Sequence, residues 1–116
     1  MKVTRKVQVE GLRDAHLGPK MEYAKISLMV EPANQLEVVL PQQLEGDEPM
    51  FVEAAVFGFL DVVLVADLRP WRDLRISVID FKIDPINSSA SAFQHAGRDA
   101  ARKFLDQVVA NPAAHI

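Results

Sequence analysis

Alternating hydrophobic and polar residues predict most of the β-strands in this chain. From Val3 to Glu10, successive residues fall on opposite faces, and Gly11 ends the predicted strand. Such alternation is typical of a strand with one buried side. Two further segments alternate in the same way, Tyr23–Val30 and Asp73–Asp80, and a shorter strand is predicted at Leu36–Leu40. The pattern thus predicts four strands.

A helical periodicity replaces this alternation from Met50 to Ala66. At 100° per residue the segment has one broad apolar face, and Pro49 suits the first turn of a helix. The run Val62–Ala66 is continuous and β-branched, so a strand there is the alternative. We favour the helix because the apolar stripe continues in phase through that run.

A second helix is predicted to follow Ser88 or Ser89, either of which can act as its N-cap, and to end at Pro112. Asp99 and Lys103 lie four residues apart and support it as an ion pair. The residues on its apolar face are Phe93, Ala96, Gly97, Ala100, Ala101, Phe104 and Val108.

The predicted order is β-β-β-α-β-(short β)-α, with hairpin loop Leu12–Glu22 and loop Phe81–Ile86. Elements of this kind bury their apolar faces as an α+β, two-layer α/β sandwich, with one mostly antiparallel sheet and both helices on one face. Residues 1–112 are predicted to form a single domain, and residues 113–116 a frayed tail.

Composition narrows the class of protein. The chain has 116 residues and a net charge of −3, whereas proteins that bind nucleic acid on their own usually carry a basic excess. It has no cysteine, which excludes disulfides and thiolate metal sites. No apolar leader follows the N-terminus, so we expect a cytoplasmic protein. The segment Met50–Ala66 is too short and too acidic to be expected to span a membrane.

No catalytic constellation is visible, so we expect neither an enzyme nor a cofactor. His16 with Asp14 and Glu22 is a conceivable metal site, but no second histidine has ligand spacing, so a solvated loop is favoured. A carboxylate pair of Asp80 and Asp84 lacks the apolar surroundings that tune such groups. No glycine-rich phosphate loop occurs.

One apolar feature is unexplained by the predicted core. Phe57 and Leu64 lie on the acidic side of the first predicted helix. They are covered either by the loop Pro41–Asp47 or by Trp71, or they form a partner surface, for example for a homodimer. The pattern does not decide between these two interpretations.

Four motifs in order resemble domain IV of elongation factor G and of the ribosomal-protection proteins. The first strand ends in Val-Glu-Gly, the second closes in Val-Glu-Pro, and the last motif reads Asn-Ser-Ser-Ala-Ser-Ala-Phe. The four motifs are Val3–Gly11, Tyr23–Pro32, Asp73–Asp80 and Ile86–Phe93. The resemblance covers nearly the whole chain. It implies a fold like domain 2 of ribosomal protein S5, a left-handed β-α-β crossover, and a stand-alone, non-catalytic binding module of translation that associates with the ribosome or RNA.

In that family, two loop tips at one end of the sheet make the contacts. The resemblance places the following residues there: Arg13, His16, Gly18, Lys20, Lys82 and Asp84. The first tip has lost most of the family's glycines, and Asp84 stands where the family usually carries a histidine. Asp14 and Asp84 also turn negative charge toward RNA phosphates. These departures favour the alternative, a protein–protein interaction or homodimerisation domain that keeps the scaffold without the ribosomal role.

Overall fold

The structure is a computed structural model that describes residues 5–66 and 73–110. Its elements come in the order β-β-β-α-β-α, which is the predicted order without the additional short strand before the last helix. They are β1 (Val7–Leu17), β2 (Lys20–Pro32), β3 (Glu37–Val39), α1 (Glu48–Val63), β4 (Leu74–Ile83) and α2 (Ala90–Ala110). Trp71, Pro112 and the predicted tail lie outside the described residues.

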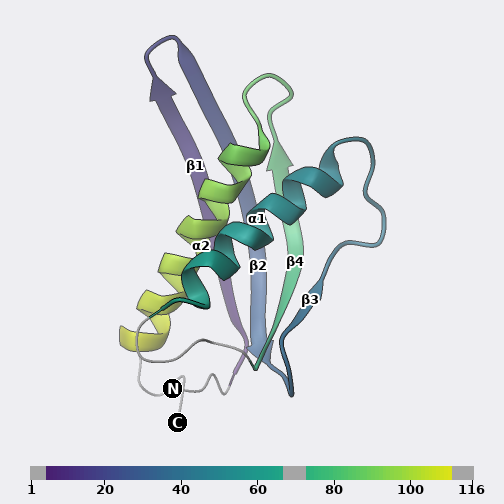
Figure 1. Ribbon diagram of the computed structural model, residues 1–116, viewed down its shortest axis with the longest axis vertical. Coiled ribbons are helices and arrows are strands. Elements are labelled where there is room, and N and C mark those ends of the chain that lie inside the picture. Colours follow the sequence, from purple (N-terminus) through teal and green to yellow (C-terminus); the bar gives the residue numbers. More distant parts are fainter. Residues whose placement is uncertain (1–4, 67–72, 111–116) are drawn as a thin grey trace.

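The four strands form one mixed sheet in the order β1-β2-β4-β3. β2 is antiparallel to both β1 and β4, whereas β3 runs parallel to β4 at the edge of the sheet. Figure 1 shows α1 and α2 together on one face of this sheet, and no helix of the described residues lies on the other face. The predicted α+β class and two-layer sandwich are therefore confirmed.

The connection from β3 through α1 to β4 is left-handed. In Figure 1 both strands point upward, α1 lies in front of the sheet, and β4 lies to the left of β3. Parallel β-α-β units are right-handed in nearly all folds, because the strand twist favours that path. The observed hand agrees with the one that the resemblance implies.

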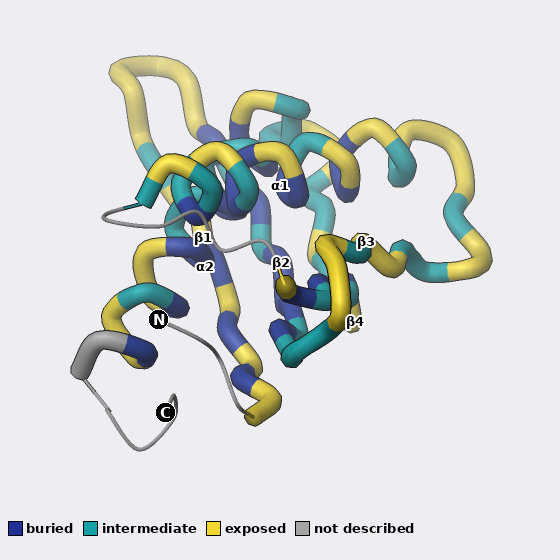
Figure 2. The backbone as a smooth tube through the Cα atoms, turned by 60° about the horizontal axis from the view of Figure 1, so that its bottom comes forward, coloured by how far each residue is buried: buried dark blue, intermediate teal, exposed yellow. Residues whose placement is uncertain are grey.

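The core lies between the sheet and the helices. Figure 2 colours the buried residues dark blue, and they recur along the strands and along both helices. The alternation of β2 is confirmed, since its inward residues Ala24, Ile26, Leu28 and Val30 are all fully buried. The predicted apolar face of α2 is buried as well. Two aromatic pairs join the helices, Phe51 with Phe93 at 5.1 Å and Phe59 with Phe104 at 5.8 Å between ring centroids.

Two glycines allow α1 and α2 to approach closely. A Cβ atom on Gly58 would lie 2.0 Å from the carbonyl oxygen of Gln94, and one on Gly97 would lie 1.8 Å from that of Ala55. Each helix therefore presents a glycine to the backbone of the other. A side chain at either position would have to push the helices apart.

The hairpin is longer than predicted. β1 continues through Gly11 to Leu17, so the prediction that Gly11 ends the strand is wrong, and the loop Leu12–Glu22 shrinks to a turn at Gly18 and Pro19. A Cβ atom on Gly11 would lie 1.8 Å from the carbonyl oxygen of Ala96. This glycine thus marks the close approach of α2 to the strand and not the end of the strand.

β4 is also longer than predicted. It continues to Ile83, so the loop Phe81–Ile86 begins too early, and the additional short strand is the end of β4 itself. Pairing with β2 shifts between Ser27 and Leu28, where Ile79 is the extra residue of a bulge. A bulge shifts the alternation of inward and outward residues by one. The pattern of the sequence therefore appears to end at the bulge although the strand continues.

α1 is helical to Val63, and two turn residues and a bend follow it. The helical interpretation of this segment is therefore correct for Val62 and Val63, although the helix ends three residues before the predicted boundary at Ala66. Among the described residues, no helix is long and apolar enough to cross a membrane.

Candidate functional site

The β1–β2 hairpin carries the first set of predicted contact residues. Gly18 adopts a positive φ of 65° in the turn, and Lys20 is the first residue of β2. His16 lies opposite Met21 in the register, and both side chains are exposed. The hairpin projects beyond the helices at the top of Figure 1.

Arg13 is already engaged within the hairpin. Its Nη2 atom lies 2.9 Å from Oε1 of Glu22, a side chain that is only 6% exposed. The hydrogen bond from Arg13 is the main reason why the pKa of Glu22 is lowered from its ordinary value. This arginine therefore neutralises a buried carboxylate and is not free to meet a phosphate.

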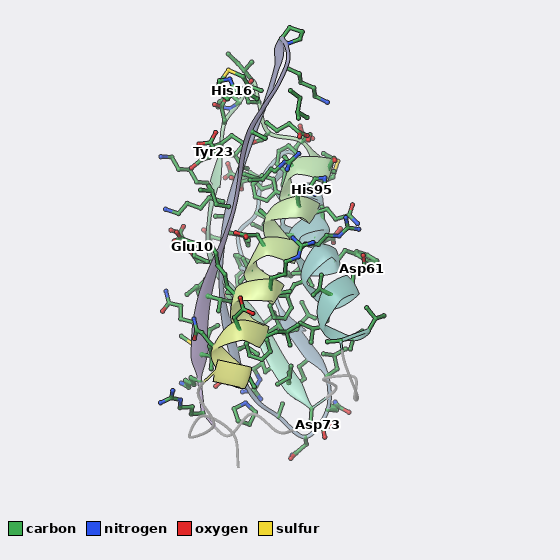
Figure 3. The ribbon with its side chains drawn as sticks, turned by 90° about the vertical axis from the view of Figure 1, so that its left-hand side faces the viewer. Glu10, His16, Tyr23, Asp61, Asp73 and His95 are labelled. Atoms are coloured by element: carbon green, nitrogen blue, oxygen red, sulfur yellow. The ribbon has the colours of Figure 1, made fainter. Side chains whose placement is uncertain are left out.

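Asp14, His16 and Glu22 do not converge on a common point. Asp14 and His16 are two residues apart on the exposed face of β1. Glu22 pairs with Ala15, so its side chain lies on the opposite face, beneath α2. Figure 3 shows His16 near the tip and His95 on α2. Within residues 5–66 and 73–110, no three His, Cys, Asp or Glu side chains are placed to hold a metal ion.

The β4–α2 loop is closed by the carboxylate of Asp84. Its Oδ1 atom accepts hydrogen bonds from the backbone N–H groups of Ile86 at 2.9 Å and Asn87 at 3.2 Å, and its Oδ2 atom accepts one from the Asn87 side chain at 3.1 Å. These donors, the Ile86 N–H first, hold the pKa of Asp84 below its ordinary value. The charge of Asp84 thus serves its own loop.

Ser88 ties the same loop to the hairpin. Its hydroxyl accepts a hydrogen bond from the Asp84 N–H at 2.8 Å and donates one to the carbonyl of Tyr23 at 2.6 Å. The Tyr23 N–H donates in turn to the carbonyl of Asn87 at 3.1 Å. Ser89 is the N-cap of α2, because its hydroxyl accepts from the Ala92 N–H at 3.0 Å.

The tip region has no excess of positive charge. Its formal charges come from equal numbers of basic and acidic side chains, which are Arg13, Lys20, Lys82, Asp14, Glu22 and Asp84. The structure thus brings the predicted tip residues to one end of the sheet, where Asp14 and Glu22, together with Asp84, balance their positive charge.

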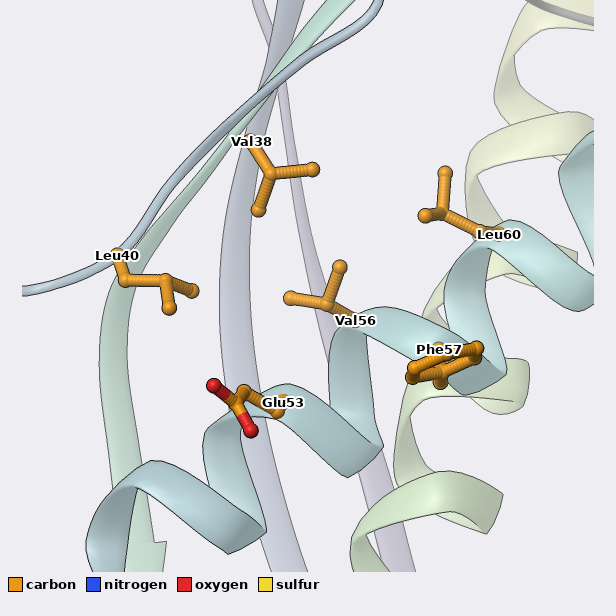
Figure 4. A pocket seen from close by; sticks show the side chains of 6 residues that line it. All are labelled: Val38, Leu40, Glu53, Val56, Phe57 and Leu60. Carbon is orange, nitrogen blue, oxygen red and sulfur yellow. The ribbon is translucent and has the colours of Figure 1, made fainter.

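An apolar groove, called here the α1–β3 groove, lies at the predicted partner surface of Phe57 and Leu64. It consists of two adjoining hollows of about 390 and 290 Å³. The first is lined by Val38, Leu40, Glu53, Val56, Phe57 and Leu60 (Figure 4). The second is lined by Phe57, Leu60, Asp61, Leu64 and Val65. Phe57 and Leu60 line both hollows, so the two form one continuous surface.

Some apolar residues that line this groove are highly exposed. Phe57 is 72% exposed and Val65 is 79% exposed. Val38 and Val39 of β3 are also exposed, and β3 has a single neighbouring strand in the described sheet. The groove therefore combines apolar side chains with the free edge of a sheet.

Phe57 and Leu64 thus both line the α1–β3 groove. Leu64 is half-buried there. The high exposure of Phe57 shows that the loop Pro41–Asp47 does not cover it, and Trp71 lies outside the described residues. The sequence did not reveal the contribution of β3. Its only signal was the apolar run around Val38, which does not say which helix lies beside it.

Comparisons with known proteins identify the fold alone. No family model matches the chain, and no curated protein matches it. A crystal structure of a protein from Thermus thermophilus superposes with a TM-score of 0.73 at 21% sequence identity. The match covers 88% of this chain but 16% of that protein, so the chain spans about a sixth of the length of its structural neighbour. The same fold thus occurs as one part of a much longer protein.

Proposed function

We propose that this chain is a non-catalytic binding module that holds a partner protein in the α1–β3 groove. The observation that carries this proposal is the position of Phe57, which is 72% exposed on the wall shared by both hollows. Burying such a side chain is worth roughly 1.5–3 kcal/mol. Contiguous exposed apolar surface of this kind marks interaction sites in folded proteins.

The lining of the groove favours a protein over a nucleic acid. It offers aliphatic and aromatic side chains and the edge of β3, whereas its ionisable members, Glu53 and Asp61, are acidic. RNA and DNA are held chiefly through basic contacts to phosphate. A protein segment supplies apolar side chains that can pack against this lining and backbone groups that can pair with the edge of β3.

Site-specific photocrosslinking tests the proposal in cells that express the chain. A benzophenone amino acid is placed at Phe57 in one variant and at Ile86 in another. Ile86 is a matched control, because it is 89% exposed but lies on the β4–α2 loop. We expect a discrete protein adduct from position 57 that position 86 does not give.

Three results would count against a groove-bound partner protein. Adducts of equal yield from both positions would indicate non-specific contact, and an absence of adducts at position 57 would remove the proposal. An adduct between two copies of this chain would replace the partner protein with a homodimer.

A second candidate is association with the ribosome or RNA, as the resemblance to domain IV of elongation factor G implies. It is favoured by the left-handed crossover and by the two tips at one end of the sheet, where Lys20 and Lys82 are exposed. Co-sedimentation with ribosomes at low and moderate salt tests it. Binding that the double variant Lys20→Glu, Lys82→Glu weakens would support it, and no binding even at low salt would refute it.

A further inference from the structure

We propose that the occupant of the α1–β3 groove is an extended, cationic segment of a partner protein, in which two apolar side chains are flanked by lysine or arginine. This inference rests on the proposed function and specifies the chemistry of the partner. It follows from the distribution of charge around the groove and from the edge of β3.

The chain segment that builds the groove contains no basic residue. Residues 33–66, from before β3 to the end of the turn after α1, have no Lys, Arg or His. The acidic residues in the same segment are Glu37, Glu45, Asp47, Glu48, Glu53 and Asp61. The other residues of the chain hold all thirteen Lys and Arg against ten Asp and Glu, a net of +3. The net charge of −3 is therefore the sum of −6 in residues 33–66 and +3 in the rest of the chain.

The carboxylates beside the groove differ in whether they have an ion pair among the described residues. Glu37 is paired with Arg75 at 2.8 Å, and Asp61 with Arg98 at 2.9 Å. Glu53 lines the first hollow and is exposed, and no ion pair to it is found among the described residues. Figure 4 shows its carboxylate beside the apolar side chains of that hollow.

The approach to α1 adds further negative charge. Glu45 and Asp47 in the connection, and Glu48 in the first helical turn, likewise have no ion pair within the described part of the chain. Glu48 precedes Glu53 by five residues on α1, about 7.5 Å along the helix axis. That separation is within the roughly 8–10 Å over which salt screens exposed charges, so Glu48 adds to the negative potential at the groove.

This charge distribution decides between the possible occupants. A second copy of the chain joined through the same face would bring two acidic surfaces together, because a twofold interface is self-complementary. Like charges across an interface disfavour association. A cationic protein segment meets no such repulsion, and its lysine or arginine side chains find carboxylates, such as that of Glu53, that have no ion pair among the described residues.

The edge of β3 favours an extended segment. β3 pairs with β4 on one side, and no strand of residues 5–66 or 73–110 pairs with its other side, which can accept an added strand. The two hollows are offset by about four residues of α1, which is about 6 Å along the helix axis. Residues two apart in a strand project to the same face at about 6.6–6.8 Å. The spacing of side chains in an extended segment therefore matches the spacing of the two hollows.

Selection from a library of short random peptides displayed on phage tests this inference without presuming a sequence. The full chain is the target, and selected peptides are titrated against variants by fluorescence anisotropy. We expect the selected peptides to carry net positive charge and two apolar residues two apart. Their affinity is expected to fall roughly tenfold or more with Glu53→Lys, and to fall as salt rises.

Matched variants separate this inference from the proposed function. Phe57→Asp and Val65→Asp, both at exposed positions, should abolish binding, whereas Ile86→Asp should leave it unchanged. Circular dichroism verifies that each variant is folded. Neutral or acidic peptides that still depend on Phe57 would overturn the cationic partner and leave the groove as a binding site. Peptides insensitive to Phe57→Asp, or no enrichment at all, would overturn both.

Discussion

The hairpin end of the molecule and the α1–β3 groove are both exposed. They differ in whether their side chains already have hydrogen bonds or ion pairs to other residues of the chain. At the hairpin end, Arg13 neutralises Glu22 and the carboxylate of Asp84 accepts three hydrogen bonds from its own loop. In the groove, Phe57 is largely exposed and Glu53 has no ion pair among the described residues.

This difference shows why polar residues at a loop tip are weak evidence for binding. A charged side chain that stabilises its own loop already has hydrogen-bond partners. A ligand that bound this side chain would have to replace those partners, which costs free energy. Exposed apolar side chains have no comparable internal role. The groove is therefore the region where removing a side chain should cost binding and leave stability intact.

The largest expected effect separates two phenylalanines of α1. Phe59 is fully buried, so Phe59→Ala should lower the free energy of unfolding by about 3–5 kcal/mol. Phe57→Ala should change it by no more than about 0.5 kcal/mol, because Phe57 is exposed. Urea titration measures both. A large loss of stability from Phe57→Ala would show that this side chain supports the fold and would weaken the binding role assigned to it.

At the hairpin end, a smaller effect is expected from Ser88. Ser88→Ala removes the hydroxyl that joins Asp84 to the carbonyl of Tyr23, and should cost about 1–3 kcal/mol. Ser91→Ala is the control, since Ser91 is an exposed residue in the first turn of α2. Equal midpoints of urea unfolding for the two variants would mean that the tip is less tightly tied than its hydrogen bonds indicate.

The smallest effect concerns the pH dependence of stability. The pKa of Asp84 is lowered in the folded chain, so its ionised form stabilises the fold above the pKa of the unfolded state. That contribution is lost as pH falls through the folded pKa. Asp84→Asn should therefore lower stability at neutral pH and matter less in acid, as urea titrations at a series of pH values would measure. Asp14→Asn, on the exposed face of β1, is the control. A pH-independent difference would contradict the closed loop.

The sequence was informative wherever a residue's environment follows from its neighbours along the chain. The alternation of β2 and the face of α2 were predicted residue by residue, because a regular element that packs on one side repeats its period. The N-cap was predicted at Ser88 or Ser89 for the same local reason, and Ser89 occupies it.

What the sequence did not reveal depends on contacts between distant segments. Gly11 reads locally as a strand end, yet it lies where the backbone of α2 passes over β1. Ile79 occupies a bulge that only the pairing of β4 with β2 explains. The groove itself was half predicted, as Phe57 and Leu64, because the placement of β3 beside α1 is a matter of topology.

Gly58 and Phe57 are neighbours in the chain but are subject to opposite evolutionary constraints. Gly58 meets the backbone of α2, and Gly97 meets that of α1, so neither can gain a side chain without moving both helices. Phe57 is 72% exposed, and the core does not depend on it. Among relatives, we expect glycine to persist at positions 58 and 97, whereas the residue at position 57 should vary with the partner that each relative binds. A relative that keeps both glycines and replaces the phenylalanine would have retained the scaffold and changed its partner.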